Sequence, residues 1–250
     1  MVSPTGHTPQ TPGELVNGWA VTWSRGSAGD FHHNAPPDDT PPQIWIHRPD
    51  RPALVLGSTQ PADLVDAAAA ETDGIEVCDR RSGGGLVPID PDRDCWIDVI
   101  VPRTSRLWED DIGRAFRWVG RRWAEVLAEP PLLLDPVIAT ANRPSPAGRV
   151  WCFADLGHGE VSVGGSKVVG LSQRRTRTWT RIQSMVLWSW PGGRLRRYVD
   201  PAAMVRRHPD RFPDPAALGP EHVTAGMPPH ATAITPDELA RRFLADLPHP

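Results

Sequence analysis

The stretch VSVGGSKVVGLSQRRTRT, residues 161–178, carries a fold signal and a chemical signal together. Two apolar runs flank the pair Gly164 and Gly165, a pattern typical of a tight turn between adjacent β-strands. Lys167 follows the turn, and it is the only lysine among 27 Lys plus Arg residues. An ammonium group is a compact point charge, whereas a guanidinium is a wide planar fork. We therefore expect Lys167 to neutralise a carboxylate or the developing charge on a carbonyl oxygen at a fixed point.

Strands and helices are mixed along the rest of the chain. Apolar residues at helical spacing predict a helix over 110–129, and shorter helices are expected at 61–74 and 236–244. The segment 24–42 is too rich in proline to predict a helix. Strands are expected at 43–47, 53–57, 75–78, 86–89, 95–101, 149–154, 159–165, 166–173 and 182–190. Because short turns join many of these strands, the fold class is α+β with a mixed, largely antiparallel sheet.

Composition narrows the class of protein. A net charge of -3 and a pI near 6.3 argue against a dedicated nucleic-acid binder, and no apolar run reaches the roughly 18 residues of a membrane span. Three widely spaced cysteines without a CxxC pair predict neither a disulfide framework nor a zinc site, which fits the cytoplasm. His32 and His33 are neighbours and point apart on a regular strand, so no metal pair is expected. We expect a tail over 1–14, a folded domain over 15–207, and a Pro-rich segment with a short helix over 208–250.

The motif DRRSGGG, residues 79–85, is the second candidate for chemistry. Three successive glycines leave backbone N–H groups open to a close ligand, and the adjacent arginines can pair with a carboxylate or phosphate. The combination suits a phosphate-bearing or acyl-adenylate ligand. The alternative is a Gly-rich connection between strands with no ligand. By contrast, the basic run over 173–181 is expected to be a solvated hairpin tip that could meet an acidic partner.

The order of these motifs resembles the lipoate-protein ligase A family of the biotin and lipoate ligase superfamily. RRSGGG is followed some 80 residues later by GSKVVGLSQRR, and ALVLGSTQ at 53–60 is similar to a family strand ending in Gly-x-x-Gln. The run CFADLGHGEVSVGGSKVVGLSQRRTR is the most family-like part of the chain. The resemblance extends over about residues 40–190, and residues 15–207 would form the ligase-like catalytic domain.

The resemblance implies an enzyme that joins lipoic or octanoic acid to a lysine of a lipoyl-carrier domain through an acyl-adenylate. ATP would activate the acid, with Mg²⁺ bound to the ATP, and no metal site of the protein's own is expected. The carrier would be the acyltransferase subunit of a dehydrogenase complex or the glycine-cleavage carrier protein. Lys167 would contact the activated carboxyl group. The family motifs would further supply binding residues for the adenylate and the acyl chain: Arg80, Arg81, Ser82, Gly83, Gly84, Gly85, Asp90, Gly170, Gly57 and Gln60.

Departures from the family pattern keep two other functions open. Asp79 stands where an arginine is usual, unless Arg81 replaces it, and Ile89 stands where a histidine is typical. These changes favour a non-catalytic paralogue that binds a ligand or a partner subunit. Cys152, 15 residues before Lys167, matches the cysteine that accepts the acyl group in the octanoyltransferase branch, where an ammonium would stabilise its thiolate. The alternative for Cys152 is a buried structural cysteine.

Overall fold

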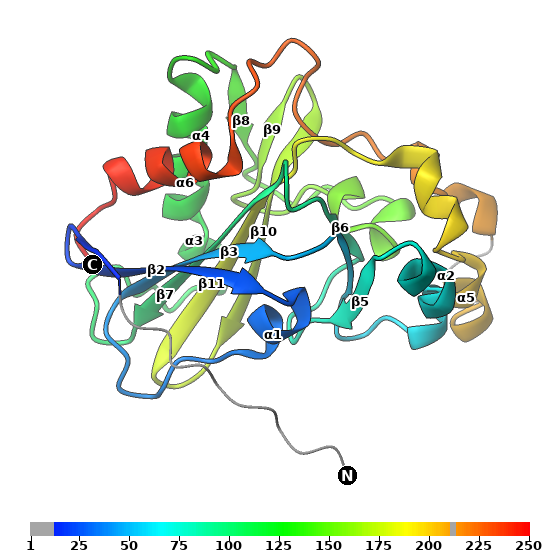
Figure 1. Ribbon diagram of the computed structural model, residues 1–250, viewed down its shortest axis with the longest axis horizontal. Coiled ribbons are helices and arrows are strands. Elements are labelled where there is room, and N and C mark those ends of the chain that lie inside the picture. Colours follow the sequence, from blue (N-terminus) through cyan, green and yellow to red (C-terminus); the bar gives the residue numbers. More distant parts are fainter. Residues whose placement is uncertain (1–12, 211–213) are drawn as a thin grey trace.

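The computed structural model describes residues 13–210 and 214–250, so most of the expected tail over 1–14 lies outside the described residues (Figure 1). The fold is α+β, as predicted. An eight-stranded sheet forms its centre, in the order β1-β2-β3-β7-β11-β10-β9-β8. Its neighbours are antiparallel except for β2 and β3. In chain order its strands are β1 (Leu15–Val16), β2 (Trp19–Gly26), β3 (Gln43–Pro49), β7 (Cys95–Pro102), β8 (Pro136–Ile138), β9 (Val161–Val163), β10 (Ser166–Arg175) and β11 (Trp179–Val186).

A three-stranded sheet lies beside the large one and carries the glycine motif. Its order is β5 (Glu76–Asp79), β4 (Ala53–Leu56) and β6 (Val87–Ile89), with β4 parallel to β5 and antiparallel to β6. In Figure 1, α2 (Ala67–Thr72) and α5 (Ala202–Arg207) gather on this side of the molecule. Residues 79–85 connect β5 to β6, so the glycine loop joins two strands of the small sheet.

Two longer helices cover the large sheet elsewhere. The expected helix over 110–129 forms as α3 (Ile112–Ala115) and α4 (Arg117–Ala128), and α4 packs with α6 (Pro236–Ala245) over the main core. The Trp19 indole on β2 donates a 2.8 Å hydrogen bond to the Pro248 carbonyl, which ties the first long strand to the segment after α6. Within residues 13–210 and 214–250, no helix is both long and apolar enough to cross a membrane.

Three sequence-based expectations for these elements were wrong. Residues 149–154 form no strand; two 3-10 turns, Ala147–Arg149 and Cys152–Ala154, flank a single bridge from Trp151 to Leu86. This run is apolar because it is buried, and burial alone does not distinguish strands from turns. The helix expected over 61–74 is a 3-10 turn (Ala62–Leu64) followed by α2. The basic run over 173–181 is not one exposed tip, because Trp179 and Arg181 are buried in β11.

The segment 24–42 does contain a helix, against expectation. Helix α1 (Ala28–His33) ends before the prolines begin at Pro36, so they do not interrupt it. The buried Glu76 carboxylate accepts the N–H groups of Ala28 and Gly29 at 3.1 and 2.8 Å. An anion at the first turn of a helix stabilises its exposed N–H groups, and this contact comes from β5, far from α1 in sequence.

The other end of α1 rests on Arg181. Its guanidinium donates hydrogen bonds of 2.6 Å to the carbonyls of Phe31 and Asn34, where a cation is favoured by the helix dipole. The same guanidinium is paired with the Asp98 carboxylate of β7, and both side chains are fully buried. His47 Nε2 lies 2.9 Å from the same carboxylate. Burial by itself raises the pKa of Asp98, but Arg181 and His47 outweigh it and hold the pKa well below its usual value.

Arg181→Met should strongly destabilise the protein. The change leaves the Asp98 carboxylate buried without its cation, and removing one partner of a buried pair costs about 3–5 kcal/mol. The measurement is the free energy of unfolding in urea. Arg177→Met, an exposed arginine in the preceding turn, is the matched control and should change stability by less than about 0.5 kcal/mol. Equal losses in the two variants would contradict this account of Arg181.

A second buried carboxylate, Asp94, closes the turn between β6 and β7. Its two oxygens accept the N–H groups of Asp90 and Trp188 at 2.8 and 2.7 Å. Burial raises the pKa of Asp94 to about 7, which the two hydrogen bonds only partly counteract. Because the folded protein holds the proton more tightly than the unfolded chain, Asp94 contributes stability at low pH that is lost as the pH rises through 7.

The free energy of unfolding attributable to Asp94 should therefore fall by about 2 kcal/mol between pH 5 and pH 7, because the slope of about 1.4 kcal/mol per pH unit decreases as Asp94 begins to ionise. Asp94→Asn, which carries no titrating proton, should remove this slope even if its amide lowers stability at every pH. Urea titrations of both proteins at several pH values measure the difference. The same slope in the two proteins would show that Asp94 is ionised throughout.

Candidate functional site

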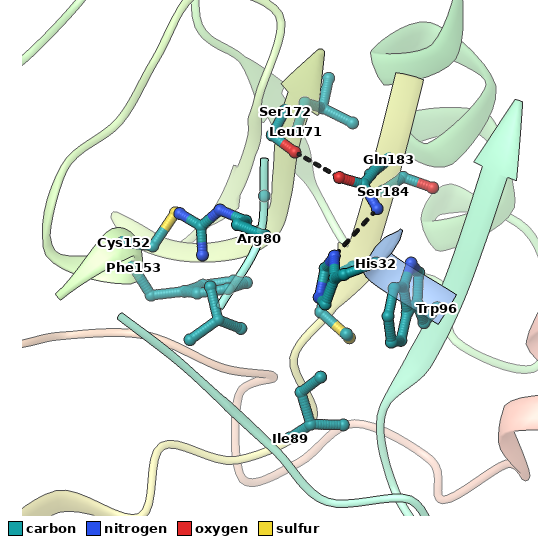
Figure 2. Close-up of a pocket in the computed structure, with 13 residues that line it drawn as sticks. His32, Arg80, Ile89, Trp96, Cys152, Phe153, Leu171, Ser172, Gln183 and Ser184 are labelled. Carbon is teal, nitrogen blue, oxygen red and sulfur yellow. Dashed lines mark hydrogen bonds between the residues drawn. The ribbon is translucent and has the colours of Figure 1, made fainter. Parts of the chain in front are cut away.

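A pocket opens between the small sheet, α1 and the β10–β11 hairpin (Figure 2). The empty space is about 420 Å³ when its open mouth is counted, and the centre of a water molecule can move in about 40 Å³ of it. The pocket is therefore narrow, and a ligand chain would have to part some of its side chains. The lining combines apolar groups with a few polar ones: His32, Arg80, Val87, Ile89, Trp96, Cys152, Phe153, Gly170, Leu171, Ser172, Gln183, Ser184 and Met185.

Each of the three loop glycines meets a different requirement. A Cβ on Gly85 would lie 2.6 Å from the backbone of Trp151 and Cys152, so this glycine permits a close approach of two backbones. Gly84 has a φ of +102°, which a side chain would strain. A Cβ on Gly83 would meet nothing within 4 Å. Gly83 therefore leaves exposed backbone beside open space, whereas Gly85 serves packing.

Arg80 holds this loop from beneath. Its buried guanidinium donates to the carbonyls of Gly83 at 3.0 Å, Gly85 at 2.7 Å and Val55 at 3.4 Å. These bonds direct the guanidinium to protein carbonyls, so its expected role as an anchor for an anion stays a prediction. Ser82 is buried as well and bonds to Ser172 at 3.3 Å, whereas Arg81 is exposed.

Gly57 and Gln60 do not reach the pocket wall, although the resemblance assigned them to the acyl site. A Cβ on Gly57 would lie 1.9 Å from the Gly84 carbonyl oxygen, so Gly57 packs directly on the glycine loop. The Gln60 amide accepts the Gly57 N–H and donates to the carbonyls of Arg149 and Val150 at 3.1 and 3.0 Å. Both residues thus brace the loop against the segment that carries Cys152. Asp90 also lies outside the lining, in the turn closed by Asp94.

Lys167 is buried behind the pocket and paired with Glu160. Its Nζ lies 2.6 Å from Glu160 Oε2, with side-chain exposures of 4% and 6%. The ammonium also donates a 2.8 Å hydrogen bond to the Cys152 carbonyl and lies 5.0 Å from the centre of the Phe153 ring. Burial alone lowers the pKa of Lys167, but Glu160 outweighs it and the pKa is raised, so the group is charged. Both partners are groups of the protein itself, so the expected contact of Lys167 with an activated carboxyl group stays a prediction.

Cys152 lines the pocket itself. Its backbone N–H donates to the Leu86 carbonyl at 3.0 Å, and its carbonyl is held by Lys167, so the residue is fixed on both sides. Its Sγ lies 3.9 Å from the position that a Cβ on Gly84 would occupy. Figure 2 places Cys152, Phe153 and Arg80 on one side of the cavity and His32 with Trp96 on the other. The thiol therefore borders both the glycine loop and the apolar space.

The opposite wall of the pocket is polar. Ser172 Oγ donates to Gln183 Oε1 at 3.4 Å, and Gln183 Nε2 lies 3.2 Å from His32 Nδ1. Burial lowers the pKa of His32 well below its ordinary value, so the ring is neutral. His33, the next residue, is instead half exposed and lies 3.7 Å from Asp79. The two histidines point apart, as expected, and only His32 faces the pocket.

Arg81 of the loop and its neighbour Arg174 have no anionic partner among the residues that the structure describes. Arg174 Nη1 is buried and has no hydrogen-bond partner in the described part of the chain. Burial lowers the pKa of Arg174, and the neighbouring charges of Arg81 and Arg181 lower it further. Cations that repel one another favour an anion between or beside them. Across residues 13–210 and 214–250, no group of three His, Cys, Asp or Glu side chains is placed to hold a metal ion.

Sequence reasoning missed Glu160, His32 and Gln183. Glu160 was detectable in principle, because the only lysine begins one strand of a hairpin and the acid ends the segment before the other strand. His32 carried no signal, since its burial depends on a helix that the proline content argued against. Gln183 has the alternation of a strand residue and no other mark.

Comparisons with known proteins identify the family and the fold of the chain. The family model described as the lipoyl protein ligase A/B catalytic domain matches residues 30–243. No curated protein matches the chain by sequence. One similar solved structure is described as a bi-partite lipoate protein ligase and its E2 lipoyl domain from Thermoplasma acidophilum. It has a TM-score of 0.62 and 16% identity over 90% of this chain and 80% of that one.

Two other structures share the fold at similar identity. A T. acidophilum lipoate ligase with bound lipoic acid has a TM-score of 0.61 and 17% identity, covering 90% of this chain and 82% of that one. A lipoate-protein ligase A bound with ATP has a TM-score of 0.51 and 17% identity, covering 82% of each chain. At these identities the likeness establishes the fold, while the family model covers most of the chain.

The Lys167–Glu160 pair should behave as one unit in stability. Lys167→Met leaves a buried carboxylate unpaired and should cost about 3–5 kcal/mol. The double variant with Glu160→Gln removes the charge as well and should recover at least about half of that loss. A double-mutant cycle of unfolding free energies measures the coupling. Additive losses would contradict a coupled pair.

Proposed function

Because the chain belongs to the lipoyl protein ligase A/B catalytic domain family, we propose that it transfers a lipoyl-type acyl group to a lysine of a lipoyl-carrier domain. The pocket is the observation that carries this proposal. Apolar groups such as Ile89, Met185 and Phe153 suit a hydrocarbon chain, and Cys152 borders the same space. A thiol beside an apolar pocket and a glycine loop suits an activated acyl group that must be handed to an amine.

A lipoyl-carrier domain is the proposed partner. The similar T. acidophilum ligase is described together with its E2 lipoyl domain, and this supports a carrier of that kind. The acyltransferase subunit of a dehydrogenase complex and the glycine-cleavage carrier protein are the two forms we consider. We place the reaction in the cytoplasm, consistent with the three free cysteines.

The route that the geometry supports best runs through a thioester on Cys152. The Cys152 sulfur attacks the carbonyl carbon of an acyl thioester, and the bond from that carbon to the donor's sulfur breaks. The donor leaves as a thiol with the proton that Cys152 gives up. The ε-amine of the carrier lysine then attacks the new thioester, an amide bond forms, and the Cys152 thiol is restored by the amine's proton.

Lys167 would position the nucleophile in this route. Two of its three N–H donors engage Glu160 and the Cys152 carbonyl, and the third has no acceptor within the described ranges. The ammonium fixes the Cys152 backbone through its carbonyl, and the remaining donor would stabilise charge on the acyl oxygen. Gly170 supports the arrangement, because a Cβ there would lie 3.0 Å from the Phe153 ring.

An ATP-dependent ligase that forms an acyl-adenylate is the second candidate. The open backbone at Gly83 and the unpaired Arg174 beside Arg81 fit a phosphate group. ATP, with Mg²⁺ bound to it, would supply the activation of a free lipoate or octanoate carboxyl group. In that route the loop N–H groups and the two arginines would hold the phosphate, and Lys167 would stay near the carboxyl group.

Intact mass spectrometry of an apo lipoyl-carrier domain tests both routes. The domain is incubated with this protein and an octanoyl or lipoyl thioester without ATP, or with the free acid and Mg²⁺-ATP. We expect a gain of one acyl group from the thioester, and a loss of at least about 10³-fold in rate for Cys152→Ser. Cys78→Ser, at a cysteine outside the pocket, is the control and should retain the rate.

Other results would redirect the proposal in defined ways. A gain that needs ATP and survives Cys152→Ser would establish the adenylate route. No gain under either condition, with acyl compounds still raising the melting temperature, would indicate a non-catalytic paralogue.

A further inference from the structure

His32 brings a polar group to the part of the pocket wall that lies across from Cys152. Figure 2 shows its imidazole turned toward the space between it and the Cys152–Phe153 side. The ring stacks on Trp96 with 4.4 Å between centroids and a 32° angle, so its plane is fixed. His32 lies on α1, and hydrogen bonds to Glu76 and Arg181 hold the two ends of this helix. The position of the imidazole in the pocket wall is therefore fixed by the surrounding fold.

A chain of hydrogen-bonding side chains leads from Ser82 to His32. The Ser82 hydroxyl donates to Ser172 at 3.3 Å, and Ser172 donates to the Gln183 amide oxygen at 3.4 Å. The Gln183 amide nitrogen lies 3.2 Å from Nδ1, and in this orientation of the amide it donates to Nδ1. Because Nδ1 accepts, a neutral ring has its proton on Nε2.

The ring is held in the neutral form. Burial is the main cause of the lowered pKa of His32; the Asp98 charge acts against it, while Arg181, Arg80 and His47 act with it. Nε2 is thus a hydrogen-bond donor and is unsuited to act as a base. No acceptor for Nε2 lies within hydrogen-bond distance in the part of the chain that the structure describes.

A donor enclosed in a narrow pocket favours a ligand that supplies the missing acceptor. Covering such a donor with plain hydrocarbon is unfavourable, because its bond to water is lost without replacement. A chain with an oxygen or sulfur atom at the right position avoids this cost. The neighbouring wall, formed by Ile89, Met185 and Trp96, would pack on the methylene groups on either side.

We propose that His32 is a specificity-determining residue, which donates from Nε2 to an oxygen or sulfur acceptor on the body of the bound acyl chain. The pocket thereby selects a substituted chain over plain octanoyl. This inference rests on the proposed function for the identity of its ligand as an acyl chain. The inference adds to the proposed function a statement of which acyl chains the pocket prefers. It applies to the thioester route and to the adenylate route alike.

Direct binding of free acids tests the preference without any transfer step. Isothermal titration calorimetry compares octanoate with three chains that carry only acceptors: lipoate, 6-oxooctanoate and 7-oxooctanoate. Wild-type protein should bind at least one of the three about tenfold more tightly than octanoate, as expected for one satisfied donor. The sulfur and ketone probes distinguish the two kinds of acceptor.

Substitution of the histidine supplies the decisive comparison. His32→Phe keeps a flat ring against Trp96 and removes the donor, so the preference should fall to within about twofold. His33→Phe, at the adjacent exposed histidine, is the matched control and should keep the tenfold preference. If His32→Phe does not fold, ¹⁵N shifts of the histidine ring in wild-type protein report the tautomer and should change at Nε2 when the preferred acid binds.

Each outcome decides between the two proposals. Equal affinity of wild type for octanoate and all three other acids, or binding of none, overturns the role of His32. An unchanged preference in His32→Phe, or a ring protonated on Nδ1, overturns it as well. Selective binding without acyl transfer would leave this inference standing and remove the proposed function. Transfer that is equally fast for octanoyl and substituted chains would do the reverse.

Discussion

The buried pair of Arg181 and Asp98 is the interaction on which the site depends. It joins β11 to β7 at the centre of the large sheet, and the same guanidinium holds the last carbonyls of α1. Asp98 also orders His47 and the Trp96 indole, the ring on which His32 rests. A charge pair this deep contributes little net stability against an apolar replacement. The pair instead fixes the position of α1 against the large sheet.

Charged groups around the pocket are mostly committed to the protein itself. Arg80 donates its hydrogen bonds to loop carbonyls, and the charge of Lys167 is neutralised by Glu160. These groups shape the backbone that faces the ligand. Arg174 and His32, two of the groups left with unused hydrogen-bonding capacity, lie at different parts of the site. This division separates the groups that build the cavity from those that can discriminate between ligands.

The sequence predicted the features that arise from local pattern and failed where distant contacts decide. The hairpin around Gly164 and Gly165, with positive φ at both glycines, follows from turn chemistry. Helix α1 was not predicted, because Glu76 and Arg181, both distant in sequence, hold the two ends of its six residues. The turns around Cys152 were predicted as a strand for a different reason. A buried apolar run has no periodicity that separates a strand from turns. The glycine loop was recognisable, while its reliance on Arg80 was not.

The hydrogen bond between Trp19 and the Pro248 carbonyl has a bearing on biosynthesis. It links residues 229 positions apart, and α6 just before it buries Leu239 and Phe243 in the main core. The first long strand therefore emerges from the ribosome well before α6, which contacts β7 of the same sheet. Until that helix arrives, an apolar sheet face has no permanent cover, and chains in this state are prone to associate with one another. Chaperones that shield such surfaces would matter most for this protein in the interval before α6 is synthesised.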